Sequence, residues 1–163
     1  MKIVPLKKEQ LHIVAQLANE IWPKAYGEIL SPTQLQYMLK QFYSLDALEI
    51  QIQNGQYFLL LKDAEKAIGF LSYELNCYGT GNLKIHKIYI LPTEQGKGLG
   101  KLLIDKAIEI ATAHQQKAVF LNVNKYNKAR FFYEKLGFTI IKDEVIDIGN
   151  GYVMDDYVME LSF

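Results

Sequence analysis

The segment EQGKGLGKLL, residues 94–103, places three glycines within five positions and continues into an apolar-periodic stretch. Glycine at this density disfavours a helix interior, so the chain here either turns tightly or approaches another group closely. A helix start presents unpaired N–H groups with partial positive charge, which suits a pyrophosphate. Lys97 and Lys101 add cationic side chains. The segment therefore predicts either a phosphate-binding loop or a plain glycine-rich turn before a helix.

Two common phosphate-binding motifs do not fit this segment. A P-loop requires G-x-x-x-x-G-K-[ST], whereas Gln95 takes the place of the first glycine and Leu102 that of the hydroxyl residue. A Rossmann loop requires G-x-G-x-x-G in an early βαβ unit, whereas the glycines here fall at every second residue and follow an antiparallel meander. Neither nucleotide-binding class is supported.

Hydrophobic periodicity and turn residues predict the elements that position this loop. Helices are expected over residues 8–21, 32–42, 99–111 and 127–136, and strands over residues 1–6, 56–62, 67–78, 83–91, 118–123, 138–148 and 152–161. Ser31, followed by Pro32 and Gln34, is a helix-start signal with a capping box. The order predicts an α/β (α+β) fold, with a mixed, mostly antiparallel sheet of about seven strands and about four flanking helices. Residues 1–163 are expected to form one domain.

Composition narrows the function classes. The 163 residues carry 18 Lys+Arg and 18 Asp+Glu, and this zero net charge does not favour a broad nucleic-acid surface. Cys77 is the only cysteine, so an intrachain disulfide is impossible and no metal site is expected; a small core residue is the preferred interpretation. No signal-peptide pattern or membrane-length apolar run is present. We expect a cytoplasmic protein with no nucleic-acid or membrane partner.

Read as Q-x-x-G-x-G, residues 95–100 after a buried strand resemble the acetyl-CoA loop of the GNAT superfamily of N-acetyltransferases. KIYILPTEQGKGLGKLLIDKAIEIA is similar to the strand, loop and helix of that family, and NKARFFYEKLGF resembles its second signature. Ile68-Gly69 resembles the Ile-Gly strand that precedes the core of the family. The similarity covers about residues 66–140. Within the superfamily the chain looks most like the bacterial spermidine/spermine N-acetyltransferases.

The resemblance implies acetyl transfer from the co-substrate acetyl-CoA to an amine, by direct attack in a ternary complex. It also implies that the strand before the loop splays from a parallel neighbour and pairs with the pantetheine arm. The cofactor-binding residues that it implies are Ile88, Tyr89, Ile90, Gln95, Gly96, Lys97, Gly98, Leu99, Gly100, Lys101, Asn124 and Asn127. The family often has Asn three residues before the alanine of the second signature, but Tyr126 stands there, so either Asn124 or Asn127 is the candidate.

Two residues are candidates for catalysis. Tyr133 matches the tyrosine that donates a proton to the CoA thiolate in many members, and a phenol is protonated at neutral pH; the alternative is a core tyrosine. His86 stands where many relatives have a glutamate base, and histidine titrates near neutrality; the alternative is a structural histidine. Glu74 and Tyr73 on the adjacent strand are weaker candidates. Cys77 is not expected to carry an acyl group, because nothing near it in sequence marks an activated thiol.

The acceptor is expected to be a small-molecule amine, and a polyamine would need carboxylates and aromatic faces. The candidate acceptor-binding residues are Trp22, Tyr26, Glu28 and Tyr73, with Glu20, Asp155 and Asp156 as further acids. Each of them also fits an ordinary surface or core role. The alternatives are a protein or peptide N-acetyltransferase and a non-catalytic CoA-binding regulatory module. The strand at 152–161 offers aromatic and methionine surface for a candidate homodimer.

Overall fold

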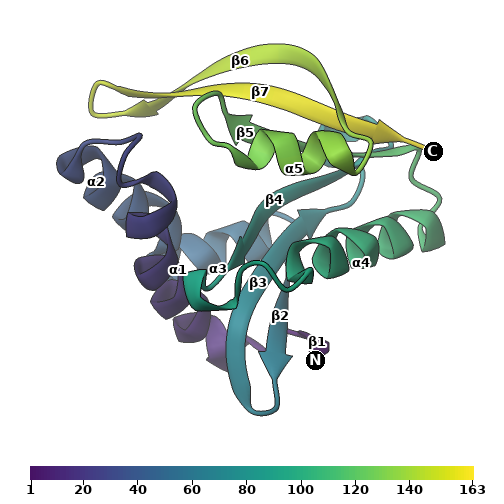
Figure 1. Ribbon diagram of the computed structural model, residues 1–163, viewed down its shortest axis with the longest axis horizontal. Coiled ribbons are helices and arrows are strands. Elements are labelled where there is room, and N and C mark those ends of the chain that lie inside the picture. The colour runs from purple at the N-terminus through teal and green to yellow at the C-terminus, as the bar shows by residue number, and fades with distance from the viewer.

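The computed structural model describes residues 1–163 and shows one seven-stranded sheet in the order β1-β2-β3-β4-β5-β7-β6 (Figure 1). The strands are β1 (Lys2–Pro5), β2 (Tyr57–Asp63), β3 (Lys66–Glu74), β4 (Leu83–Ile90), β5 (Ala118–Asn124), β6 (Thr139–Gly149) and β7 (Tyr152–Ser162). The helices are α1 (Leu11–Tyr26), α2 (Pro32–Tyr43), α3 (Leu45–Gln53), α4 (Leu99–Ala113) and α5 (Ala129–Lys135). All neighbouring strands are antiparallel except β4 and β5, which are parallel. The predicted mixed, mostly antiparallel sheet is confirmed.

The expectation of about four helices omitted α3. Ser44 alone separates this helix from α2, and its hydroxyl accepts a hydrogen bond from the Ala47 N–H at 3.2 Å. Only Leu48 of the nine residues is buried, whereas Leu45 and Ile50 are exposed. The apolar residues therefore do not mark one face of the helix, which removes the periodic signal that reveals a helix in sequence. None of the helices combines the length and the apolar character needed to cross a bilayer.

The two halves of the sheet separate at the parallel pair. β4 pairs with β5 only over Leu83–Ile85, opposite Val119–Leu121. Beyond this point β4 continues to pair with β3 on its other side, up to Ile90 opposite Gly69. The β5-facing edge of β4 from His86 onward therefore has no neighbouring strand, and backbone groups there are free to pair with a ligand.

A β-bulge lies in β4 at the start of the separated part. Lys87 is opposite Ser72 and Ile85 is opposite Tyr73, so His86 is the extra residue. A bulge of this kind bends the strand and redirects side chains, and bulges are frequent beside active sites. It is the local feature that begins the divergence of β4 from β5.

The β6–β7 hairpin extends over α2 (Figure 1). The Tyr37 hydroxyl of α2 donates to the Ile148 carbonyl at 2.7 Å, and the Tyr37 and Tyr152 rings lie 5.3 Å apart. Within the sheet, β7 lies between β5 and β6, and its Val158 and Met159 are buried. The strand expected to offer a dimer surface is thus an interior strand, and β6 is the edge strand.

Candidate active site

The glycine-rich loop leads directly into the N-terminus of α4. Gly96 has φ +83° and Gly98, the N-cap of α4, has φ +75°, a region that favours glycine. Gly100 has a different role, because a Cβ there would lie 3.0 Å from Phe132 Cζ of α5. No side chain caps α4, so its first N–H groups face outward. Gly96 also has a left-handed backbone conformation, although the family pattern does not require glycine at that position.

A cavity of about 720 Å³, here called the loop pocket, lies between this loop, the splayed part of β4, the end of β5 and α5. Its volume falls in the range of small-molecule and cofactor sites. The residues expected to bind the cofactor that line it are Ile88, Tyr89, Ile90, Gln95, Gly96, Gly98, Leu99, Gly100 and Asn127. Lys97, Lys101 and Asn124 do not line it. Lys128 does, and the sequence analysis missed this cation.

The two lysines of the loop are engaged by neighbouring acids. Lys97 Nζ forms an ion pair with Glu94, and Lys101 Nζ with Asp105 at 2.8 Å. The contact with Glu94 raises the pKa of Lys97. Both side chains are exposed, so they can turn toward a bound anion at little cost.

The two candidate asparagines have local backbone roles. Asn127 Oδ1 accepts from the Ala129 N–H at 2.9 Å at the start of α5. Asn124 Oδ1 accepts from the Tyr126 N–H at 2.9 Å. Asn127 lines the loop pocket, whereas Asn124 faces the other pocket described below. The Asn127 amide also lies beside the Tyr26 hydroxyl.

Tyr133 lines the loop pocket from α5. Its ring packs between Phe132 at 5.3 Å and Phe138 at 5.9 Å. The side chain is buried, and this burial raises the pKa of Tyr133, so that its hydroxyl stays protonated across the physiological range. The hydroxyl makes no hydrogen bond to the protein, which leaves it available as a donor to a bound group.

A second cavity of about 330 Å³, here called the hairpin pocket, lies under the β6–β7 hairpin between α1, α2 and β4. Trp22 and Tyr26 line it, as expected for acceptor-binding residues. Glu28 and Tyr73 line neither pocket; the Tyr73 ring is stacked on Tyr57 at 5.3 Å. Six residues line both pockets: Tyr26, Ile85, His86, Lys87, Tyr89 and Asn122. The two cavities therefore meet where β4 and β5 separate.

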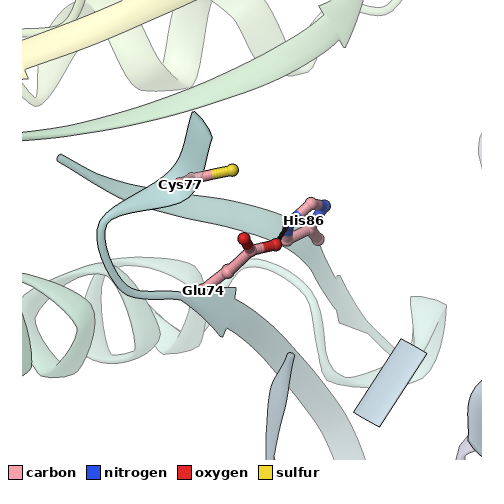
Figure 2. Close-up of side chains that lie close together, drawn as sticks. All are labelled: Glu74, Cys77 and His86. Atoms are coloured by element: carbon pink, nitrogen blue, oxygen red, sulfur yellow. Dashed lines mark hydrogen bonds and ion pairs between the residues drawn. The ribbon is translucent and has the colours of Figure 1, made fainter. Parts of the chain in front are cut away.

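His86 lies at this junction and is held by Glu74 (Figure 2). His86 Nε2 is 3.0 Å from Glu74 Oε1 of β3. Burial, together with the positive charges of Lys84 and Lys87, lowers the pKa of His86 to about 3. The ring is therefore neutral at physiological pH, with Nε2–H donating to Glu74 and Nδ1 left as an acceptor.

Cys77 lies close to this pair. One ligand atom each of Glu74, Cys77 and His86 lie within 4.8 Å of one another, an arrangement that can hold a metal ion (Figure 2). Burial and the Glu74 charge raise the pKa of the Cys77 thiol to about 11, and the Lys84 charge stands beside the cluster. A neutral thiol and a neighbouring ammonium both oppose cation binding, and the same raised pKa makes Cys77 a poor nucleophile.

Three charged residues line the hairpin pocket: Lys84, Lys87 and Asp156. Asp156 is one of the further acids expected on the acceptor side, whereas the two lysines went unnoticed in the sequence. Lys84 and Lys87 are only 8% and 9% exposed, and Asp156 is 1% exposed. A signal existed for the lysines, because LKIHKIYIL is otherwise an apolar strand and charged residues are seldom buried without a reason. Of the further acids expected there, Asp156 lines the pocket, whereas Glu20 and Asp155 do not.

Comparison with known proteins identifies the class. The chain matches the acetyltransferase (GNAT) domain family over residues 27–161. The protein therefore belongs to the GNAT acetyltransferase family, as its sequence motifs indicated. It is an acetyl-CoA-dependent N-acetyltransferase.

Two relatives are both N-acetyltransferases by name, but only the second is named for its substrate. An uncharacterised N-acetyltransferase from the pepI 3′ region of Lactobacillus delbrueckii subsp. lactis is 26% identical over 157 residues, 92% of this chain and 91% of that protein. The bS18-alanine N-acetyltransferase of Haemophilus influenzae is 46% identical over 54 residues, 33% of this chain and 37% of that protein.

Solved structures share the fold across the whole chain. The PaiA N-acetyltransferase of Thermoplasma acidophilum, in complex with coenzyme A, has a TM-score of 0.80 at 24% identity and covers 100% of both chains. A chimera of the spermidine N-acetyltransferase SpeG from Vibrio cholerae and hSSAT has a TM-score of 0.72 at 23% identity, covering 99% of this chain and 96% of that chain. The neighbours thus include a spermidine enzyme, as the sequence resemblance indicated.

Proposed function

We propose that this enzyme transfers the acetyl group of acetyl-CoA to the primary amine of a small molecule by direct attack in a ternary complex. The observation that carries the proposal is the meeting of the loop pocket and the hairpin pocket at His86 and Tyr89. Acetyl-CoA in the first pocket and the amine in the second can be held at the same time. Simultaneous binding removes the entropic cost of bringing two reactants together during reaction.

The loop and α4 supply the cofactor side of this proposal. The open N–H groups from Gly96 to Lys101 would hold the pyrophosphate, as at other helix N-termini, whereas the Gln95 N–H donates to the Pro92 carbonyl. The unpaired edge of β4 at Ile88–Ile90 would pair with the pantetheine amides. This arrangement directs the thioester toward the junction of the two pockets.

Acetyl transfer requires that one proton is removed from the amine and that one proton is supplied to the CoA thiolate. The neutral amine nitrogen attacks the thioester carbonyl carbon, the carbon–sulfur bond breaks, and the products are the N-acetylated amine and CoA. The Tyr133 hydroxyl would donate a proton to the departing thiolate. His86 Nδ1 would accept the amine proton through water, while Glu74 fixes the ring and stabilises the imidazolium that forms.

The size of the hairpin pocket favours a small acceptor. A volume of about 330 Å³ lies at the lower end of ligand sites. A peptide N-terminus is the second candidate, supported by the local likeness to the bS18-alanine N-acetyltransferase. A polyamine is a weaker candidate, because two buried lysines line the pocket and would repel a polycation, and they outnumber the one aspartate there.

Initial-rate kinetics test the proposal. Acetyl-CoA and the acceptor are varied together in a thiol-release assay, with calorimetry measuring acetyl-CoA binding alone. We expect intersecting double-reciprocal lines and no acetylated protein after incubation with acetyl-CoA. Parallel lines with an acetyl group on Cys77 would reject direct transfer. CoA binding without acetylation of any amine or peptide would favour the regulatory module.

A further inference from the structure

Two buried ammonium groups stand in the hairpin pocket without a carboxylate partner. Lys87 Nζ donates to Gln56 Oε1 at 3.3 Å and lies 5.5 Å from the Phe58 ring centroid. Lys84 Nζ donates to the Tyr78 hydroxyl at 3.1 Å. Neither lysine forms an ion pair within the protein. The charge of Lys84 favours the ionised carboxylates of Asp156 and Glu144, although it forms no ion-pair contact with either. A buried ammonium group without an ion-pair contact is costly, and an external anion between the two lysines would reduce this cost.

The bulge at His86 is what places both lysines in one pocket. In a regular strand, residues three positions apart point to opposite faces of the sheet. The extra residue in β4 offsets this alternation, and Lys84 and Lys87 line the same cavity. Burial, together with repulsion from Lys84, lowers the pKa of Lys87 to about 7. An anion bound between the two lysines would offset the free-energy cost of burying both ammonium groups in the hairpin pocket.

An acid lies in the same pocket with an unused acceptor atom. Asp156 Oδ2 accepts a hydrogen bond from Asn122 Nδ2 at 3.3 Å, whereas Asp156 Oδ1 is buried and has no partner. Two further polar atoms of the pocket, Trp22 Nε1 and Gln51 Oε1, also lack partners. The pocket thus offers unsatisfied positive and negative groups side by side, which is complementary to a zwitterion.

We propose that the acceptor carries an anionic group, a carboxylate as in an amino acid, which binds Lys84 and Lys87 while its amine is drawn toward Asp156 and the thioester. This inference rests on the proposed acetyl transfer to a small amine and names the acceptor class. A carboxylate accepts several charge-assisted hydrogen bonds and fits between two ammonium groups. A polyamine has no group for these lysines.

The same anion would prepare His86 for its role. The groups that face His86 are Glu74, Lys84 and Lys87, with Cys77 nearby. In the free enzyme, burial and then the charges of the two lysines lower the pKa of His86 and make it a very weak base. A carboxylate between them offsets their field, so the basicity of His86 rises when the acceptor is bound. Deprotonation of the amine is thereby coupled to the presence of the correct acceptor.

Trp22 provides a direct test, because it is the only tryptophan of the chain and lines the hairpin pocket. The CoA-saturated protein is titrated with matched pairs that differ only in the anion: leucine against 3-methylbutylamine, and phosphoethanolamine against ethanolamine. Spermidine is the polycation. Trp22 fluorescence reports binding, and thiol release from acetyl-CoA reports kcat/KM. We expect leucine to bind at least about tenfold more tightly than 3-methylbutylamine and to have a higher kcat/KM. The second pair tests whether the anion that the pocket binds is a phosphate and not a carboxylate.

Lys84→Met and Lys87→Met should each remove most of the preference for the anionic member, whereas Lys40→Met on the exposed surface of α2 should keep it. The inference is overturned if 3-methylbutylamine or spermidine binds as tightly as leucine or more tightly. It is also overturned if neither leucine nor phosphoethanolamine gives a saturable change in Trp22 fluorescence. These results leave the proposed acetyl transfer standing if any amine is acetylated. Should a lysine variant fail to fold, the ligand pairs on the unmodified protein decide the question.

Discussion

Lys87→Met is expected to stabilise the fold while it impairs the enzyme. Lys87 is buried, its pKa is lowered from 10.5 to about 7 by burial and by the Lys84 charge, and no carboxylate compensates it. Methionine fills a similar volume without a charge. Its neighbour Gln56 does not lose its only partner, because Ser72 Oγ still donates to Gln56 Oε1 at 3.0 Å.

The size of the effect follows from the same pKa. One pKa unit corresponds to about 1.4 kcal/mol. The lowered pKa of Lys87 therefore costs the folded state up to roughly 5 kcal/mol at a pH where Lys87 is protonated in both the folded and the unfolded protein. Loss of the hydrogen bond to Gln56 reduces the expected stabilisation by about 1 kcal/mol. The expected net gain in the free energy of unfolding at pH 7 is about 2–4 kcal/mol.

The pH dependence gives an independent check with a defined sign. The folded-state pKa of Lys87 lies below its unfolded value, so the unfolded chain binds more protons between about pH 7 and 10.5. Stability of the unmodified protein therefore rises with pH in that window because of Lys87, and the advantage of Lys87→Met shrinks there. Urea unfolding at pH 6.5, 8 and 9.5 measures this, with Lys40→Met as the exposed control. A less stable Lys87→Met protein, or an advantage that does not change with pH, would refute the buried uncompensated charge.

Four further outcomes test the site. Tyr133→Phe should lower kcat by about 10- to 100-fold and leave the Kd of acetyl-CoA nearly unchanged in calorimetry; unaltered turnover would remove Tyr133 from the mechanism. His86→Ala should flatten the limb of the kcat pH profile that reports the base in the enzyme with bound acceptor, and an identical profile would reject that role. Gly98→Val should weaken acetyl-CoA binding at least about tenfold, because valine is strained at φ +75°. Gly96→Val should do so to a similar degree, since Gly96 is also left-handed, and a normal Kd for both would reduce the loop to a turn.

The loop and the order of the strands could be predicted because local sequence encodes them. Alternation and turn residues mark strands, and the glycine spacing before an apolar-periodic segment marks the start of α4. α3 could not be found this way, since its only buried residue is Leu48. The bulge at His86 was also beyond reach, because it depends on how β4 pairs with β3 and not on β4 alone.

The acceptor side was predicted least well for a related reason. Trp22 and Tyr26 reach the hairpin pocket, but the charges that characterise it come from two strands far apart in the chain. Lys84 and Lys87 look like residues on opposite faces until the bulge is known, and Asp156 reaches them only through the β5–β7 pairing. Carboxylates and aromatic rings in the sequence suggested a cation site, whereas the folded pocket gathers two cations with one acid.

The bulge in β4 connects the three parts of the mechanism. It lies where the pairing of β4 with β5 ends, next to the free edge at Ile88–Ile90 that we propose binds the cofactor. It sets His86 at the junction of both pockets, and it places Lys84 and Lys87 in the same pocket. In the mechanism that we propose, one added residue in a strand thus couples cofactor binding, proton removal and acceptor choice. A family that keeps the loop and the bulge can change its acceptor by replacing the side chains on either side of the bulge, without altering the chemistry.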